Sequence, residues 1–284
     1  MNKWIIGARP RTLPAAIAPV LVASALAGSD FSPLPALLAL FVSLALQVGV
    51  NYANDYSDGV RGTDENRVGP TRITAAGLAT PASVKRAAFI AFGLAAIAGL
   101  ALAAMTTWWL ILVGAVAIFA AWGYTGGKNP YGYLGLGELF VFIFFGVVAT
   151  VGTFYVQSET ITLDSILASI PMGTFACALL AINNIRDRAL DAPVGKKTLA
   201  VRLGDRRSRI FFASLIALGY IAVFAMASPW LLLVLVTTPI ALRLVTGVLG
   251  EAQGKELIPY LAATGKLQLQ FSILFAISLV LSHG

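Results

Sequence analysis

Long uninterrupted apolar stretches, separated by short polar segments, make up most of this chain. We predict helices that cross a membrane, because about 20 consecutive apolar residues span a bilayer as a helix. A spanning β-barrel would instead alternate apolar and polar positions over about ten residues per strand. The fold class is therefore all-α, a polytopic membrane bundle of about nine helices. The predicted spans are residues 13–29, 34–54, 84–105, 107–124, 133–156, 166–187, 209–227, 229–249 and 264–282.

The composition agrees with a membrane protein. Hydrophobic residues are 58% of the chain and charged residues only 12%, and the mean hydropathy is +0.83. The single cysteine, Cys177, excludes an intramolecular disulfide framework and a thiolate zinc site. The apolar run that follows Arg9 and Arg11 is long enough to span, so we interpret it as a retained first helix rather than a cleaved signal. We expect residues 1–284 to form one intramembrane domain.

The basic residues are distributed very unevenly between the two sides of this predicted bundle. All twenty Lys and Arg lie in the N-terminal segment, in every second connection or at the adjoining helix ends. The opposite connections carry only Asp30, Glu159 and Asp164. By the positive-inside rule, we predict a cytoplasmic N-terminus and an external C-terminus in the cytoplasmic membrane. This asymmetry explains the net charge of +7 without a nucleic-acid partner.

A first polar cluster ends the second apolar run. It contains Asn51, Asn54, Asp55, Asp58 and Asp64. If the helix continues, Asn51, Asp55 and Asp58 share one face at positions i, i+4 and i+7. Carboxylate and amide oxygens are ligands suited to Mg²⁺. The cations that could meet phosphate oxygens just beyond are Arg61, Arg67 and Arg72.

A second polar cluster ends the sixth apolar run in the same way. Asn184, Asp187 and Asp191 lie at i, i+3 and i+7, again on one helical face. Acids at a membrane edge are usually functional and face a polar cavity. Because four aspartates on facing helices would repel one another, we expect cations between them, most simply two Mg²⁺ ions with an anionic substrate. The spacing of the two clusters also indicates a degenerate repeat of helices 1–4 and 5–8.

These residues resemble the UbiA-type intramembrane prenyltransferases, whose motifs are N-D-x-x-D-x-x-x-D and a later D-x-x-x-D. Asp187-x-x-x-Asp191 matches the second motif. Asn54-Asp55-x-x-Asp58 matches the start of the first, but position 62 is Gly and the next acid is Asp64; a register from Asn51 to Asp55 is the alternative. The family's Tyr-x-x-x-Lys element is matched by Tyr124 and Lys128.

The resemblance implies a helical bundle around a central cavity that opens laterally to lipid. Within the family, the segments NDYSDGVRGTD, RVGPTR and YTGGKNPYGYLGLGE and the run from NNIRD to KKTLAVRLG resemble the members that act on 1,4-dihydroxy-2-naphthoate. The reaction that this resemblance implies moves a polyprenyl group from polyprenyl diphosphate to 1,4-dihydroxy-2-naphthoate, with loss of diphosphate and CO₂. The implied catalytic residues are Asp55, Asp58, Asp187, Asp191 and Lys197. The implied metal ligands are the same four aspartates and Asn51. The implied substrate-binding residues are Asn51, Asn54, Arg61, Asp64, Arg72, Tyr124, Lys128, Asn183, Asn184 and Arg186.

The allylic cation of such a reaction needs a dry pocket lined by aromatic rings. The aromatic candidates are Tyr124, Tyr131, Tyr133 and Phe140. Their other possible role is in the aromatic belt at the membrane interface or in helix packing. Glu138 is the one acid inside the fifth predicted helix, and we expect it to pair with an Arg or Lys of the cavity.

Two other readings are compatible with the sequence. The same chemistry could act on 4-hydroxybenzoate or homogentisate, since members of the family that it resembles also use those acceptors. An ion-coupled transporter could also use paired aspartates, although transporter sites usually lie near the midplane on broken helices. A CDP-alcohol phosphotransferase is disfavoured, because its second acidic pair would have to follow the first closely.

Overall fold

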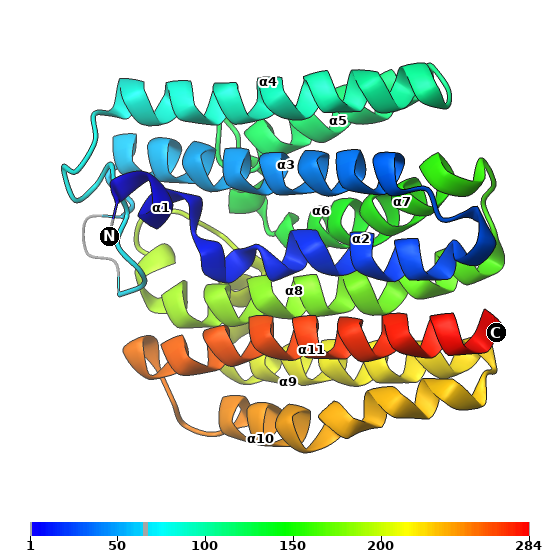
Figure 1. Cartoon of the computed structure of the whole chain (residues 1–284). Coiled ribbons are helices and arrows are strands. Elements are labelled where there is room, and N and C mark those ends of the chain that lie inside the picture. Colours follow the sequence, from blue (N-terminus) through cyan, green and yellow to red (C-terminus); the bar gives the residue numbers. More distant parts are fainter. Residues whose placement is uncertain (1, 65–67, 284) are drawn as a thin grey trace.

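The computed structural model describes residues 2–64 and 68–283, which form helices and connecting loops without a strand. Figure 1 shows these helices stacked side by side along one direction. The helices are α1 (Lys3–Ala8), η1 (Pro10–Thr12), α2 (Pro14–Leu26), η2 (Gly28–Asp30), α3 (Pro33–Val60), α4 (Pro81–Met105), α5 (Leu110–Gly123), η3 (Tyr131–Leu134), α6 (Gly137–Val141), η4 (Phe142–Val148), α7 (Ala149–Ser158), α8 (Leu163–Asp191), α9 (Leu199–Val223), η5 (Phe224–Met226), η6 (Pro229–Thr237), α10 (Thr238–Leu249), η7 (Gly254–Leu257) and α11 (Ile258–His283).

The all-α class is confirmed, but the count of nine spans is not. Within the described residues, seven helices are long and apolar enough to cross a membrane, or up to eight if the bent pair Lys3–Thr12 and Pro14–Leu26 is one span. Helix α5 has only 14 residues, which gives about 21 Å at 1.5 Å per residue. That length is short of the roughly 30 Å hydrocarbon core of a bilayer.

The connections that carry the basic residues gather at one end of the bundle. The α3–α4, α8–α9 and α10–α11 connections lie at the end with the N-terminus, whereas the C-terminus lies at the other end (Figure 1). Helices α3 and α8 extend to this basic end, because their polar last turns continue the helix instead of breaking it. Both acidic clusters therefore lie at the end of the bundle where the Lys and Arg residues concentrate.

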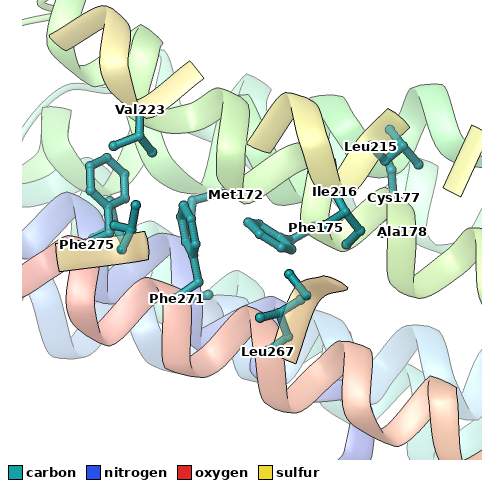
Figure 2. Packing of buried hydrophobic residues seen from close by; sticks show 14 of the residues in the cluster. Met172, Phe175, Cys177, Ala178, Leu215, Ile216, Val223, Leu267, Phe271 and Phe275 are labelled. Carbon is teal, nitrogen blue, oxygen red and sulfur yellow. The ribbon is translucent and has the colours of Figure 1, made fainter. Parts of the chain in front are cut away.

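Helix α8 is the central helix of the larger core. Its start is fixed by a capping box between Thr162 and Ser165, which satisfies backbone N–H groups that a helix start leaves unpaired. Met172 and Phe175 of α8 pack against Phe271 of α11, as Figure 2 shows. The rings of Phe175 and Phe271 lie 4.6 Å apart. This packing holds α8 at the depth from which its polar end reaches the site.

The segment from α6 to α7 is one long helix with an irregular middle. Its seven central residues, Phe142–Val148, adopt π-helical winding. Gly146 lies there directly against Gly173 of α8, so closely that a Cβ on Gly146 would come within 2.7 Å of the Gly173 Cα. Two glycines are needed for this close approach of helices, as is common in membrane bundles. The π segment forms one wall of the cavity.

Candidate functional site

A cavity of about 690 Å³ extends along the inside of the bundle. At the basic end it is lined by polar and charged side chains, and toward the other end by apolar ones. We call the polar part the head and the apolar part the arm. The head residues are Arg9, Gln47, Asn51, Asn54, Asp58, Arg72, Thr125, Asn183, Asn184, Asp187 and Lys196. This volume is in the range of small-molecule sites.

Helix α3 presents one polar face to the head. Gln47, Asn51, Asn54 and Asp58 all line the cavity, at the spacing of three and four residues that places side chains on one helical face. The Asn51 amide donates to the Ala8 carbonyl at 2.9 Å and to the Thr12 hydroxyl at 3.0 Å. Asn51 thereby ties α3 to the N-terminal segment as well as lining the head.

Asp55 does not share this face, which corrects the predicted face of Asn51, Asp55 and Asp58. Its two carboxylate oxygens accept the backbone N–H groups of Ile73 at 2.9 Å and of Thr74 at 2.8 Å. The side chain is completely buried and does not line the cavity. The returning loop buries two N–H groups beside α3, and buried backbone donors need an acceptor. Asp55 supplies that acceptor and fixes the loop at residues 73–74.

Asp58 faces the head and is held by two groups from distant parts of the chain. The Tyr133 hydroxyl donates to one Asp58 oxygen at 2.8 Å, and the Lys196 ammonium lies 3.4 Å from the other. The same ammonium is 3.8 Å from Asp191. A single cation therefore bridges carboxylates on α3 and α8. Burial, followed by the nearby Asp58 charge, raises the pKa of Tyr133 above its usual value, so the phenol stays a donor.

Three further polar side chains, at the end of α8, line the cavity: Asn183, Asn184 and Asp187. Asp187 forms a bidentate pair with the neighbouring Arg186, at 2.8 and 2.7 Å. Arg186 is buried, outside the cavity lining, and also donates to Asn183 at 2.7 Å. The Asn184 amide donates to the Glu138 carboxylate at 2.9 Å. The hypothesis that Glu138 pairs with an Arg or Lys is thus corrected, because its partner among the described residues is an amide.

The loop after α3 covers the head with an ion pair. Arg72 lies 3.2 Å from Asp64, and both side chains are buried. Arg72 lines the cavity beside Gly69, Pro70 and Thr71, whereas Asp64 is outside the lining. Arg72 therefore faces the head, and Asp64 pairs with it from outside the cavity.

Three predicted cations lie elsewhere. Lys128 and Lys197 are exposed and outside the cavity lining. Arg61 is also exposed; it donates to the carbonyls of Thr125 and Gly127 and stacks over the Tyr133 ring at 5.2 Å. Arg61 therefore fixes the loop after α5, and Lys196 takes the place predicted for Lys197. Arg67 is outside the described residues.

Some lining residues were not found from the sequence. Gln47 lies one turn before Asn51 in an apolar run, and a polar side chain inside a span is a signal that could have identified it. Thr125 donates to Asn54 at 2.7 Å and so orients that amide. Arg9 lines the head and donates to the Asn51 carbonyl at 3.1 Å, although its place in the sequence indicates only a topological charge.

Residues 16–253 match the model of the UbiA prenyltransferase family. The chain belongs to this family. It is 48% identical to the 1,4-dihydroxy-2-naphthoate octaprenyltransferase of Mycobacterium tuberculosis, over 96% of this chain and 95% of that protein. It is 38% identical to the Escherichia coli protein of the same name, over 99% of this chain and 96% of that protein.

The fold of this UbiA family member is also found among solved structures. The structure of a UbiA homolog from Archaeoglobus fulgidus bound to DMAPP and Mg²⁺ superposes with a TM-score of 0.67, covering 98% of this chain and 99% of that chain. The sequence identity is 15%, so this likeness concerns the fold alone. Two membrane bundles with such different sequences thus share one helix arrangement.

The head residues of this UbiA family member fit a divalent cation. Among the described residues no three acidic, histidine or cysteine side chains form a ready metal cluster. However, Mg²⁺ is often held by one or two carboxylates together with substrate phosphates and waters. The Lys196 ammonium lies 3.4 Å from Asp58 and 3.8 Å from Asp191, which marks a position where a cation already lies between both carboxylates. Asp58 and Asp187 line the head and would hold a metal ion there, together with Asp191, which is outside the cavity lining and is reached through the same Lys196 ammonium.

Proposed function

We propose that this protein transfers a polyprenyl group from polyprenyl diphosphate to 1,4-dihydroxy-2-naphthoate, with loss of diphosphate and CO₂, giving demethylmenaquinol. The observation that supports it most is one cavity with a charged head and an apolar arm, in a chain 48% identical to a protein named for this acceptor. An amphipathic donor with a diphosphate at one end and a hydrocarbon at the other matches that division. The proposed cofactor is two Mg²⁺ ions bound with the diphosphate.

The charged head would bind the diphosphate. Lys196 and Arg72 line it, and a fixed cation in a water-poor site stabilises developing negative charge far better than one in water. Asp58, Asp187 and Asp191 would hold the metal ions. Mg²⁺, when bound, would neutralise charge on the departing diphosphate. Asn54 and Asn184 are oriented by Thr125 and Glu138, so their amides present fixed dipoles to the substrates.

Aromatic rings lie where the head meets the arm. Tyr124 and Tyr131 are in edge contact at 5.5 Å, and Tyr131 stacks on Phe140 at 4.1 Å. Tyr124, Tyr131 and Phe140 line the cavity. Ring faces stabilise an allylic cation and exclude the water that would quench it. We assign this group to the reacting carbon of the donor, with the naphthoate ring beside it.

The proposed orientation places the head at the cytoplasmic side of the cell membrane. The N-terminus and the basic connections would face the cytoplasm and the C-terminus the outside. Substrates with charged groups would then reach the head from the cytoplasmic face, while the apolar arm lies at the depth of the lipid chains. Cysteine labelling of positions near each terminus in intact cells tests this orientation.

The experiment that tests the function is a turnover assay on the purified protein in detergent. It contains dihydroxynaphthoate, geranylgeranyl diphosphate and Mg²⁺, with an EDTA control and 4-hydroxybenzoate as the competing acceptor. We expect a prenylated, decarboxylated naphthoquinol that disappears with EDTA. Prenylation of hydroxybenzoate alone would keep the reaction class and overturn the acceptor. No transfer to either acceptor, with metal and donor still bound, would overturn the proposal.

A further inference from the structure

The apolar arm has a defined far end. It is lined there by Ala39 of α3, Leu102 of α4, Leu110 of α5 and Val156 of α7. These side chains pack into one apolar cluster. From Ala39 to Asp58 the cavity follows α3 for about 28 Å at 1.5 Å per residue. The arm is therefore a long apolar channel with the charged head at one end and this cluster at the other.

Three glycines surround the arm one helical turn before its far end. Gly99, Gly114 and Gly152 line the cavity on α4, α5 and α7. Each lies three or four residues nearer the head than the member of the end cluster on the same helix. We call these three residues the glycine ring. Three helices thus lack a side chain at the same depth of the same cavity.

The glycine ring is not required by helix packing. A Cβ built on Gly99, Gly114 or Gly152 meets no heavy atom within 4 Å. By contrast, a Cβ on Gly146 would come within 2.7 Å of Gly173 on the neighbouring helix. Glycine also lowers helix stability relative to residues with side chains. What these three glycines contribute is open volume in the arm.

The π segment keeps one row of side chains facing the arm as far as the glycine ring. Phe140, Phe144, Val148, Gly152 and Val156 are spaced four apart, and all line the cavity. In a regular α-helix, each step of four residues rotates the side chain by about 40° around the helix axis. Over several steps, this row of side chains would therefore rotate away from the cavity. The wider i→i+5 winding of Phe142–Val148 offsets that drift. The wall therefore stays straight from the aromatic rings to Gly152.

We propose that the glycine ring holds the distal isoprene units of the donor and sets the chain length that the protein prefers. This inference rests on the proposed prenyl transfer. An isoprenoid chain is an apolar, branched hydrocarbon, so burial in an apolar channel favours each further unit that fits. The ring leaves open volume just before the Leu102–Leu110–Val156 cluster, where a long chain must turn or end. Side chains at the ring would shorten the channel without touching the head.

The test compares donors of increasing length on single substitutions. Dimethylallyl, geranyl, farnesyl and geranylgeranyl diphosphate are assayed with Gly114→Leu and Gly152→Leu, in detergent and with Mg²⁺. We expect the ratio of kcat/KM for geranylgeranyl over dimethylallyl diphosphate to fall about tenfold in each, because overfilling a packed apolar site is unfavourable. Gly114→Ala and Gly152→Ala should shift the ratio in the same direction by less.

Gly93→Leu is the matched control. Gly93 is on α4, like Gly99, and a Cβ there also meets nothing within 4 Å, but it is exposed and outside the cavity lining. Its ratio should equal that of the wild type. An unchanged ratio in both Leu variants, or an equal shift in Gly93→Leu, would overturn the inference. Absence of transfer by the wild type with every donor would instead refute the proposed function.

Discussion

The two acidic helix ends use their carboxylates in different ways. At the end of α3, Asp58 faces the cavity while Asp55 binds two backbone N–H groups of the returning loop. At the end of α8, Asp187 and Asp191 are each beside a cation, Arg186 and Lys196. At the end of α3, one acid therefore stabilises the returning loop and the other lines the cavity. The second end presents both of its acids next to positive charge.

This difference follows from what packs beside each helix. The chain leaves α3 and returns along it at residues 73–74, so α3 must supply acceptors to that loop. The chain leaves α8 through a short turn in which the Lys196 N–H donates to the carbonyl of Asp191, so that the Lys196 side chain returns to the end of the helix. A motif of closely spaced acids consequently does not tell which of them holds a substrate.

The largest effect is expected for the two carboxylates that line the head, Asp58 and Asp187. Asp58→Asn and Asp187→Asn should each lower kcat by about a hundredfold or more, because fixed charge in a water-poor site is the main source of rate enhancement. Both proteins should still insert and purify normally. Turnover with Mg²⁺ measures the loss, and near-normal activity of either variant would remove that residue from the proposed metal site.

The next comparison uses two adjacent lysines. Lys196→Met should lower kcat/KM for the donor about tenfold to a hundredfold, because it removes the cation between Asp58 and Asp191. Lys197→Met should change it little, since Lys197 is exposed and outside the cavity. Kinetics with varied donor concentration measure both. A larger loss from Lys197→Met would support the sequence-based choice over the structural one.

The lysine pair also illustrates what the sequence could and could not predict. Hydropathy located most spans and the polar ends of α3 and α8, because membrane helices must bury continuous apolar runs. The choice between Lys196 and Lys197, or between Asn54 and Asp55, depends on the direction in which a loop or helix face points. Those directions are set by packing against segments that are distant in sequence, such as residues 73–74 and Tyr133. The degenerate repeat stays a prediction.

The π segment and the glycine ring were beyond sequence reasoning for a related reason. A run such as Phe142–Val148 is apolar in any helical winding, so its pattern does not distinguish π from α. Glycines in an apolar span can serve close packing, as Gly146 does, or line a cavity, as Gly152 does. Only the neighbours in space separate the two roles.

A smaller effect is expected for the pair that orients the α8 face. Glu138→Ala should lower kcat/KM about tenfold, because Asn184 loses the acceptor that orients its amide. Glu138→Gln keeps an amide oxygen as acceptor and should stay within about threefold of wild type. A double variant with Asn184→Ala should be no worse than Asn184→Ala alone. Equal losses for Gln and Ala would show that the charge of Glu138, not its acceptor, is what matters.

Asp55 should affect stability more than chemistry, in contrast to Asp58. Asp55→Asn replaces one acceptor oxygen by an NH₂ group that faces a buried N–H donor, which costs about 1–3 kcal/mol. We expect a lower melting temperature in detergent and little change in kcat per folded molecule. Thermal unfolding and active-site titration separate the two effects. A normal melting temperature with abolished turnover would return Asp55 to the catalytic residues.

The smallest effect concerns the hydrogen bond that the Tyr133 hydroxyl donates to Asp58. Tyr133→Phe should destabilise the metal-free protein by about 0.5–1.5 kcal/mol. Because burial raises the pKa of Tyr133 in the folded protein, this stabilisation should be fully present below the unfolded value of about 10 and disappear as the pH rises through the higher folded value. Melting temperatures of both proteins in EDTA, compared from neutral to alkaline pH, measure it. A difference that vanishes near pH 8, well below the unfolded value, would show that the phenol does not hold Asp58.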